Sequence, residues 1–467
     1  MVRQRWDTVA RTEPLGTALV YATLLVSALA SAVLLLTVAS ITPTERATLV
    51  IVGLTAWVLL VALGWARGTL PLRPVLVAIV LTSLLAVATP SHQSNDVFSY
   101  AMYGRIVTEH HHNPYDTYPM HFEGDPMRRH VSDIWQRTPD IYGPAFTVVM
   151  AALAPVVGES TFLARLLYQL IAVSAVGALL WLLWKRTRNP TVLAFVGLHP
   201  LVSVSVINGG HPDALIALAF MLAFLLALER RVVPCALALA FGVSINFSVI
   251  AGAAALGVWA ARRWTRPETV KLAAITLGLG AAPYLFLSGW LDNAKAHQEL
   301  VSRLSVWNPL GSILTGPFPY VSLSASQLRS VMPDSTTLMA GLLLIFVLVR
   351  FTGRRTPELA IAAALAAFLV TSPWVMPWYA FAAFPFLAMR RPNLLAWSVA
   401  IYSAFILMSD QFPSLSPEVV GSVTHHFYQT AIPALACLAC VISIVARPRP
   451  RDVSTPAADD ELTLLIA

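Results

Sequence analysis

The stretch "TALVYATLLVSALASAVLLLTVASI" (Thr17–Ile41) contains no charged residue and is long enough to cross the ~30 Å hydrocarbon core of a bilayer as a helix. The whole chain has the same character, since 57% of its 467 residues are hydrophobic and 12% are charged, whereas soluble domains carry about 25% charged residues. Its continuous apolar runs lack the alternation of barrel strands. We therefore predict an all-α polytopic membrane protein.

Further apolar runs predict a bundle of about 12–14 transmembrane helices in a single domain, residues 1–446. The first run is too long for a cleaved signal peptide and is expected to remain as a helix. Polar segments interrupt the runs at 90–142 and 291–336, and the tail 447–467 is expected to be disordered. The expected apolar segments are Thr17–Ile41, Ala47–Trp65, Leu70–Thr89, Gly143–Gly158, Thr161–Trp184, Pro190–Ile207, Pro212–Leu228, Val232–Trp259, Thr269–Trp290, Thr337–Phe351, Glu358–Val370, Met376–Met389, Asn393–Ser409 and Phe427–Ala446.

Basic clusters between the apolar runs indicate the orientation in the plasma membrane, because cytoplasmic loops carry an excess of Lys and Arg. We expect both termini and the loops "WARGTLPLR", "WKRTR", "ERR", "ARRWTR", "RFTGRR" and "MRRP" on the cytoplasmic side. Segments 90–142 and 291–336 then become the first and second outer loops, on the extracytoplasmic face. This assignment requires Gly143–Gly158 to be a surface or re-entrant helix, and Val232–Trp259 to be a hairpin that dips at "SINFS".

Other classes of function receive little support. The net charge of +7 arises from the loop clusters and does not indicate a nucleic-acid partner. The three cysteines lie within apolar stretches and predict core residues rather than a disulfide framework (Cys235, Cys437 and Cys440). Consecutive histidines on a helix point in different directions, so His110–His112, with His121 and His130, do not establish a metal site. No cofactor is firmly implied, and the sequence does not support a divalent metal.

The stretch "SNDVFSYAMYGRIV" after the third crossing is the first candidate site. Read as a helix, it has one polar face made of Asp96, Ser99, Tyr100 and Tyr103. Three apolar residues are then expected to pack against the membrane surface, Val97, Met102 and Ile106. A partly desolvated carboxylate has a raised pKa, which suits a general base for a hydroxyl nucleophile. The alternative is an acid placed at the positive end of a helix dipole.

Four arginines are candidates for binding a phosphate, because the planar guanidinium matches phosphate geometry. Arg105, Arg128 and Arg129 lie in the first outer loop, and Arg165 lies near the start of an apolar helix. A charge in that position is costly unless it is paired. The alternative for each of them is an arginine that extends to the lipid headgroups.

Two later stretches are expected on the same extracytoplasmic side as Asp96. In "INGGHPDALIAL" the two glycines permit a tight turn and Pro212 suits a first helical position, so His211 and Asp213 are expected to face the same vestibule as Asp96. A well-formed helix start is the alternative. In "TSPWVMPWYAFAAFPF", Trp374, Trp378 and Tyr379 are suited either to stacking on a sugar or to anchoring at the interface. Weaker signals on this side are Trp307, Asn308, His425 and His426.

The segment "NDVFSYAMYGRIVTEHHHNPYDTYP", followed by "YGP", resembles the first outer loop of GT-C glycosyltransferases. Within that class it is most similar to the actinobacterial polyprenol-phosphate-mannose-dependent α-1,6-mannosyltransferases of lipomannan and lipoarabinomannan assembly. "NGGHPDAL" and "MPWY" are similar to the Gly-His-Asn-Asp-Ala-Leu and Pro-Trp-Tyr stretches of those enzymes. The resemblance covers Ser91–Pro144, these two shorter patches and the overall hydropathy.

The resemblance implies an inverting transfer of mannose from a polyprenyl-phosphate-mannose donor to a mannan or glycolipid acceptor, with Asp96 as the base. Arg105, Arg128, Arg129 or Arg165 would stabilise the phosphate leaving group. The sugar and the acceptor would contact Tyr100, Tyr103, Asn113, Tyr115, Tyr142, His211, Asp213, Trp374, Trp378 and Tyr379. Two positions depart from the relatives: Asn246 stands where they often carry Lys, and Pro212 stands in place of Asn.

Two alternatives remain open at this stage. The donor could carry another lipid-linked sugar, such as an arabinofuranosyl or glucosyl group. The chain could instead be a transporter or flippase for a lipid-linked saccharide, which would need polar residues deep within several helices. Central segments such as "LIALAFMLAFLLAL" and "AIAAALAAFLV" contain none, which favours an enzyme acting at one membrane surface.

Overall fold

The computed structural model describes residues 14–37, 39–91, 94–298, 305, 307, 325–353, 357–411 and 432–445. Every regular element within these ranges is a helix, which confirms the predicted all-α polytopic class. Four helices of the described part are long and apolar enough to cross a membrane, namely Leu15–Thr37, Thr44–Arg67, Thr161–Thr187 and Arg266–Phe286, and shorter apolar helices accompany them. Outside the described residues lie Arg3, Arg5, Arg11, Asn308, His425, His426, most of the second outer loop and the tail 447–467.

The helices fall into two groups, those of the bundle and the short ones of the first outer loop, which lie between α4 and α8 in the sequence. The bundle elements are α2 (Pro14–Thr37), α3 (Pro43–Arg67), α4 (Leu72–Ala88), α8 (Thr161–Thr187), α9 (Pro190–Gly197), η3 (Val202–Ile207), α10 (Asp213–Leu228), α11 (Val232–Ile245), η4 (Phe247–Val249), α12 (Ile250–Ala261), α13 (Arg266–Ile275), η5 (Thr276–Ala281), η6 (Ala282–Phe286), α14 (Trp290–Gln298), α16 (Ala325–Phe351), α17 (Glu358–Thr371), η7 (Pro377–Ala383), α18 (Phe384–Ala388), α19 (Leu394–Gln411) and α22 (Ile432–Val445). The loop elements are α5 (Asp96–Thr108), η1 (Pro119–His121), η2 (Arg128–His130), α6 (Asp133–Gln136) and α7 (Pro144–Val157).

Local sequence signals explain where several of these helices begin and end. At the start of α3, Thr42 and Glu45 form a reciprocal capping box, and Gly68 ends the helix in the left-handed region with φ of 86°. At the start of α8, the Ser160 side chain accepts a hydrogen bond from the Leu163 backbone N–H. These caps satisfy backbone groups that the helix itself leaves unpaired.

One end of the bundle, here called the basic end, gathers the basic loops. Side chains join helix termini there through three contacts: Arg67 Nη2 to Thr17 Oγ1 at 3.2 Å, Arg230 Nη2 to Glu268 Oε2 at 2.6 Å, and Arg390 Nε to Glu358 Oε1 at 2.5 Å. These contacts join the expected cytoplasmic segments in pairs: the start of α2 with the end of α3, the α10–α11 turn with the start of α13, and the start of α17 with the α18–α19 turn.

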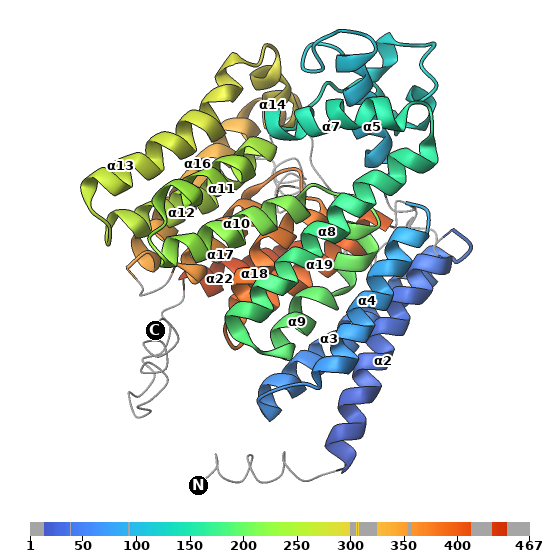
Figure 1. The fold of residues 1–467 in the computed structure, drawn as a ribbon, viewed down its shortest axis with the longest axis vertical. Coiled ribbons are helices and arrows are strands. Elements are labelled where there is room, and N and C mark those ends of the chain that lie inside the picture. Colours follow the sequence, from blue (N-terminus) through green and yellow to red (C-terminus); the bar gives the residue numbers. More distant parts are fainter. Residues whose placement is uncertain are drawn as a thin grey trace, which may run out of the picture.

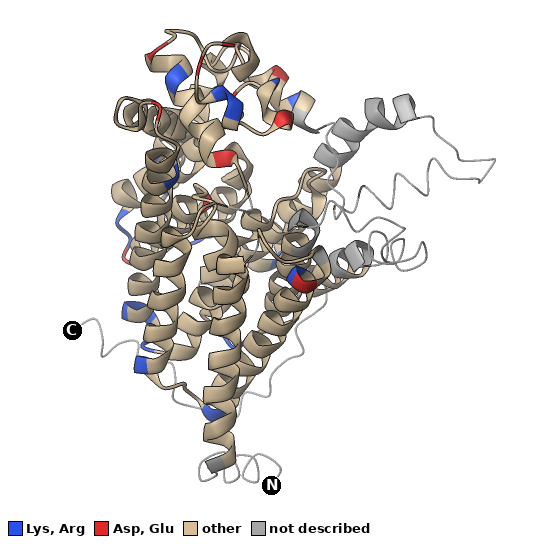
Figure 2. Ribbon diagram, turned by 90° about the vertical axis from the view of Figure 1, so that its right-hand side faces the viewer, with Lys and Arg blue, Asp and Glu red and all other residues tan. Residues whose placement is uncertain are grey.

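The other end of the bundle carries a cap, defined as α5 through α7. Figure 1 shows α5 and α7 lying across the top of the bundle, above α8 and α4. Most of the acidic residues visible in Figure 2 belong to this end. Helix α7 packs directly against α5, so Gly143–Gly158 lies in the cap rather than in the bundle.

Two further expectations can be compared with the fold. The break at "SINFS" is present, because α11 ends at Ile245 and α12 begins at Ile250, and the Gly143 N–H donates to the Ile245 carbonyl at 2.8 Å beside the cap. The expectation that part of α5 packs on the membrane surface is wrong, because Val97, Met102 and Ile106 are fully buried in protein. The polar residues Asp96, Ser99 and Arg105 are buried as well, so protein covers α5 on all sides.

Candidate active site

Asp96 is the first residue of α5 and is 7% exposed. Its backbone N–H donates to Ser94 Oγ at 3.1 Å, and its Oδ1 accepts a hydrogen bond from Trp135 Nε1 at 3.1 Å. Burial raises the pKa of the Asp96 carboxyl to about 6, although the hydrogen bonds from Ser94 and Trp135 oppose that rise. The group is thus poised to exchange a proton near neutral pH.

A histidine and two tyrosines lie on the side of the second carboxylate oxygen of Asp96. Asp96 Oδ2 lies 3.9 Å from His211 Nδ1. The Tyr100 hydroxyl lies 3.0 Å from the same His211 nitrogen and 3.1 Å from the Tyr142 hydroxyl. Among the described residues no group forms a hydrogen bond with the buried His211 Nε2. The predicted approach of His211 to Asp96 is therefore present in the structure, and Tyr142 joins the same cluster through Tyr100.

The aromatic stretch after α17 closes another side of this site. The His211 ring stacks on Trp378 with centroids 3.5 Å apart, and Trp374 meets Trp135 edge to face at 6.1 Å. Tyr379 is close enough to interact electrostatically with both Asp96 and Asp213. Asp213, the buried first residue of α10, also interacts with Asp96. Four separate segments of the chain thus converge on one carboxylate.

Two residues of this region were not predicted from the sequence. Trp135 lies on the short helix α6 and binds Asp96 across 39 positions of chain, a distance that no helical or strand period reveals. Asp140 is fully buried, and its carboxylate accepts hydrogen bonds from the Tyr142 N–H and the Thr147 hydroxyl, both at 2.9 Å. Burial raises the pKa of Asp140 to about 7. These bonds fix the turn that presents Tyr142.

Three predicted contact residues lie beside this cluster or away from it. The Tyr103 hydroxyl donates to the Thr138 carbonyl at 2.8 Å. Tyr115 belongs to a small separate cluster with Tyr284 and Trp290. Asn113 donates to the Asp116 carboxylate at 2.5 Å, on the side of the cap that faces α14. The latter two residues organise the loop and are not brought to Asp96.

Two of the predicted phosphate ligands already have protein partners. Arg105 Nε binds Asp125 Oδ2 at 2.9 Å, and its Nη1 donates to the Gly158 carbonyl at 2.9 Å. Burial alone would raise the pKa of Asp125, but hydrogen bonds from His110, the Met127 N–H and Arg105 outweigh it and lower that pKa. Arg165 Nη1 contacts carbonyl groups at the end of α4. Both arginines therefore hold backbone segments together.

The other two arginines lie in η2, near the start of α5. The neighbouring His130 ring packs against Phe98 with centroids 5.5 Å apart, and Phe98 is two residues from Asp96. Arg129 Nε donates to the Pro126 carbonyl at 3.2 Å. Arg128 Nε is buried and has no hydrogen-bond partner among the described residues.

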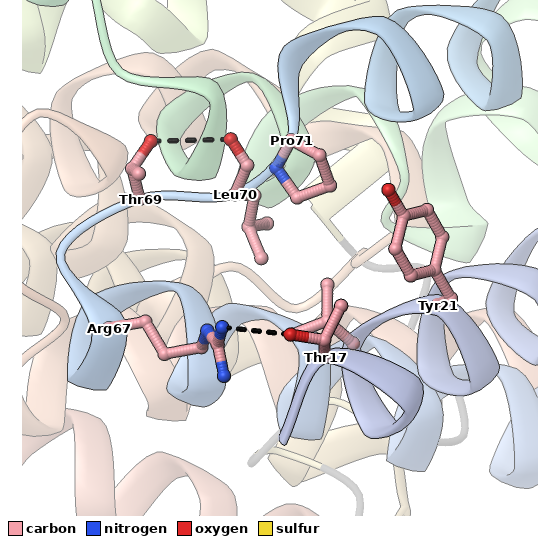
Figure 3. Close-up of a pocket in the computed structure, with 7 residues that line it drawn as sticks. Thr17, Tyr21, Arg67, Thr69, Leu70 and Pro71 are labelled. Atoms are coloured by element: carbon pink, nitrogen blue, oxygen red, sulfur yellow. Dashed lines mark hydrogen bonds between the residues drawn. The ribbon is translucent and has the colours of Figure 1, made fainter. Parts of the chain in front are cut away.

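Two hollows lie outside this cluster. An apolar hollow of about 430 Å³ between α7, α8 and α10 is lined by residues that include Leu153, Leu167, Ser174 and Leu215. A cavity of about 360 Å³ at the basic end is lined by Thr17, Tyr21, Arg67 and neighbouring residues (Figure 3), and shares no residue with the Asp96 site. In the described part of the chain, no three His, Cys, Asp or Glu side chains form a potential metal site.

Comparisons with known proteins identify the family of the chain. An α-(1→6)-mannopyranosyltransferase of Corynebacterium glutamicum is 22% identical over 409 residues, which cover 78% of this chain and 79% of the relative. A second, from Mycobacterium tuberculosis, is 26% identical over 234 residues, covering 46% of this chain and 45% of the relative. No solved structure matches. The model of the N-terminal domain of the α-(1→6)-mannopyranosyltransferases matches residues 14–262, more than half of the chain. This multi-pass membrane protein is a glycosyltransferase that belongs to the α-(1→6)-mannopyranosyltransferase family.

Proposed function

We propose that the protein transfers mannose from a polyprenyl-phosphate-mannose donor to a mannan or glycolipid acceptor, with inversion, forming an α-1,6-mannoside. The reaction belongs to cell-envelope lipoglycan synthesis on the extracytoplasmic face. The observation that carries this proposal is a buried carboxyl whose pKa is raised to about 6 at the point where four segments of the chain meet. Family membership supports the sugar, and the position of Asp96 supports the chemistry.

The geometry suggests how the residues divide the work. Trp135 holds Oδ1 of Asp96 and leaves Oδ2 directed toward His211. The Asp96 carboxylate takes the proton of the acceptor hydroxyl, which attacks C1 of the mannosyl group while the bond from C1 to the phosphate oxygen breaks. The leaving phosphate needs a cation. Arg128 is the candidate, because its Nε has no hydrogen-bond partner among the described residues and its helix η2 packs against α5.

The apolar hollow between α7, α8 and α10 is suited to the lipid part of the donor. One lining residue, Leu215, lies in the same first turns of α10 as Asp213. Its lining is almost entirely aliphatic, and Leu170, also in the lining, is exposed on the outer surface of the bundle. A prenyl chain placed there would leave its phosphate at the level of Asp96, where the glycan acceptor arrives from water.

The substitution Asp96→Asn tests the base assignment in purified protein. It keeps the shape of the side chain and removes the proton acceptor, so the rate of mannosyl transfer should fall by about 10²-fold or more. The exposed Asp133→Asn on α6 is the matched control and should retain wild-type transfer. Full activity of Asp96→Asn would exclude Asp96 as the base.

The donor class is tested separately with a panel of lipid-phosphate sugars. We expect polyprenyl-phosphate mannose to be used, and a donor with a truncated prenyl chain to show a higher KM at similar kcat. Use of an arabinofuranosyl or glucosyl donor in preference to mannose would contradict the proposed sugar without affecting the base assignment.

A further inference from the structure

The C-terminal end of α4 is held by three side chains from other helices. Helix ends leave their last four carbonyl groups without partners in the helix, and α4 ends at Ala88, just before the outer loop that carries Asp96. Asn208 Nδ2 donates to the carbonyls of Ala86 at 2.9 Å and Pro90 at 3.0 Å. Arg165 Nη1 lies 2.9 Å from the Val87 carbonyl and 2.7 Å from the Thr89 carbonyl. The end of α4 is therefore capped by side chains.

The third side chain links the other two. Gln169 Oε1 accepts a hydrogen bond from Arg165 Nη1 at 2.9 Å, and Gln169 Nε2 donates to the Asn208 carbonyl at 2.7 Å. Gln169 is fully buried and Asn208 is 1% exposed, so these bonds are shielded from competing water. The positive Arg165 also lies at the negative end of the α4 dipole. The three residues form one connected network, here called the α4 clamp.

The α4 clamp joins the two halves of the candidate active site. Pro90, which Asn208 holds, precedes Asp96 by six residues, and a turn in which Ser91 Oγ donates to the Ser94 carbonyl at 2.7 Å leads into α5. Asn208 itself precedes His211 by three residues, in the turn that opens α10. One amide side chain thus fixes the Asp96 segment relative to the segment that carries His211.

We propose that Arg165, Gln169 and Asn208 position Asp96 against His211, and that Arg165 acts by holding the end of α4 rather than by binding the donor phosphate. The inference deepens the proposed function and depends on it only for the activity readouts. Asn208 is uncharged and buried, and its side-chain amide donates to carbonyl groups at the end of α4. It therefore cannot act as a cation for the phosphate. Loss of Asn208 should resemble loss of Arg165.

The test compares Arg165→Met, Arg165→Lys and Asn208→Leu in the full-length protein. For Arg165→Met and Asn208→Leu we expect kcat to fall by tenfold or more with the donor KM changed less than about threefold. The acidic limb of the pH–kcat profile should move to lower pH in both, because a displaced Asp96 becomes more hydrated. Lys can reach the same carbonyl groups, so Arg165→Lys should recover much of the rate. The control is Arg186→Met, an exposed residue near the other end of α8.

A second readout does not require any activity. Hydrogen exchange of the backbone amides at the end of α4 and in the first two turns of α5 should accelerate in Arg165→Met and Asn208→Leu, and not in Arg186→Met. A large rise in donor KM for Arg165→Met, with unchanged kcat and unchanged exchange, would overturn the α4 clamp and restore Arg165 as a phosphate ligand. If the wild-type protein used no mannosyl donor, the proposed function would fail while the exchange result still decided the clamp.

Discussion

At the scale of single residues, the two oxygens of Asp96 have different surroundings. Trp135 donates to Oδ1, whereas Oδ2 faces His211 Nδ1 at 3.9 Å. Burial raises the pKa of Asp96 to about 6, and the hydrogen bond from Trp135 limits that rise. A base must be ionised to act, so activity should be present above this pKa and should fall as the pH drops through it.

Removing the indole N–H of Trp135 should shift the pKa of Asp96 in a defined direction. In Trp135→Phe the hydrogen bond that favours the carboxylate is lost, so the pKa of Asp96 should rise and the acidic limb of the kcat/KM profile should move to higher pH. Among the described residues, the ionisable groups that interact with Asp96 are Tyr100, Tyr103, Tyr142, His211, Asp213 and Tyr379. None of these is substituted, so a shift reports on Asp96. An acidic limb that stays in place, or moves to lower pH, would contradict the role given to Trp135.

At the scale of elements, the position of Asp96 depends on how closely α5 and α7 approach. A Cβ at Gly104 would collide with the Met150 carbonyl and would lie 3.2 Å from the Ala154 Cβ. Alanine is favoured over glycine in a helix by about 1 kcal/mol, but overpacking costs about 1–3 kcal/mol. We therefore expect Gly104→Ala to lower the thermal unfolding midpoint and to reduce mannosyl transfer.

A second helical glycine provides the comparison for this prediction. Gly177 on α8 has open space around its Cβ position, so Gly177→Ala should keep or raise the unfolding midpoint. Both variants are measured in the same detergent by thermal unfolding. A Gly104→Ala protein as stable and as active as wild type would show that α5 and α7 can separate without affecting the site.

The helices could be predicted from the sequence, whereas most of the side-chain contacts between them could not. Apolar runs correctly predicted a helical bundle, because a chain in lipid must pair its own backbone groups. The grouping of Asp96 with His211 and Trp378 was also foreseen, since each followed or preceded a crossing on the same predicted side. The pairing of Arg105 with Asp125 and of Arg165 with the end of α4 was not, because such contacts depend on loop paths and helix packing that no periodicity encodes.

At the scale of the whole molecule, the basic loops and the cap lie at different ends of the bundle, although the cap also carries arginines such as Arg105 and Arg128. The basic loops meet at the end opposite the cap, through contacts such as Arg67 with Thr17 and Arg230 with Glu268. Because Lys and Arg are retained in the cytoplasm during insertion, the cap and Asp96 should face outside. This orientation is required if the acceptor glycan arrives from the aqueous extracytoplasmic side.

Labelling of single cysteines in intact cells tests the orientation directly. In a variant without Cys235, Cys437 and Cys440, Glu123→Cys places a thiol on an exposed residue of the cap, and Arg186→Cys places one near the basic end. A membrane-impermeant maleimide should label the first in intact cells, and the second only after the membrane is permeabilised. The reverse pattern would place Asp96 in the cytoplasm, where a lipid-linked donor presented on the outer face could not reach it, and the proposed extracytoplasmic transfer would have to be abandoned.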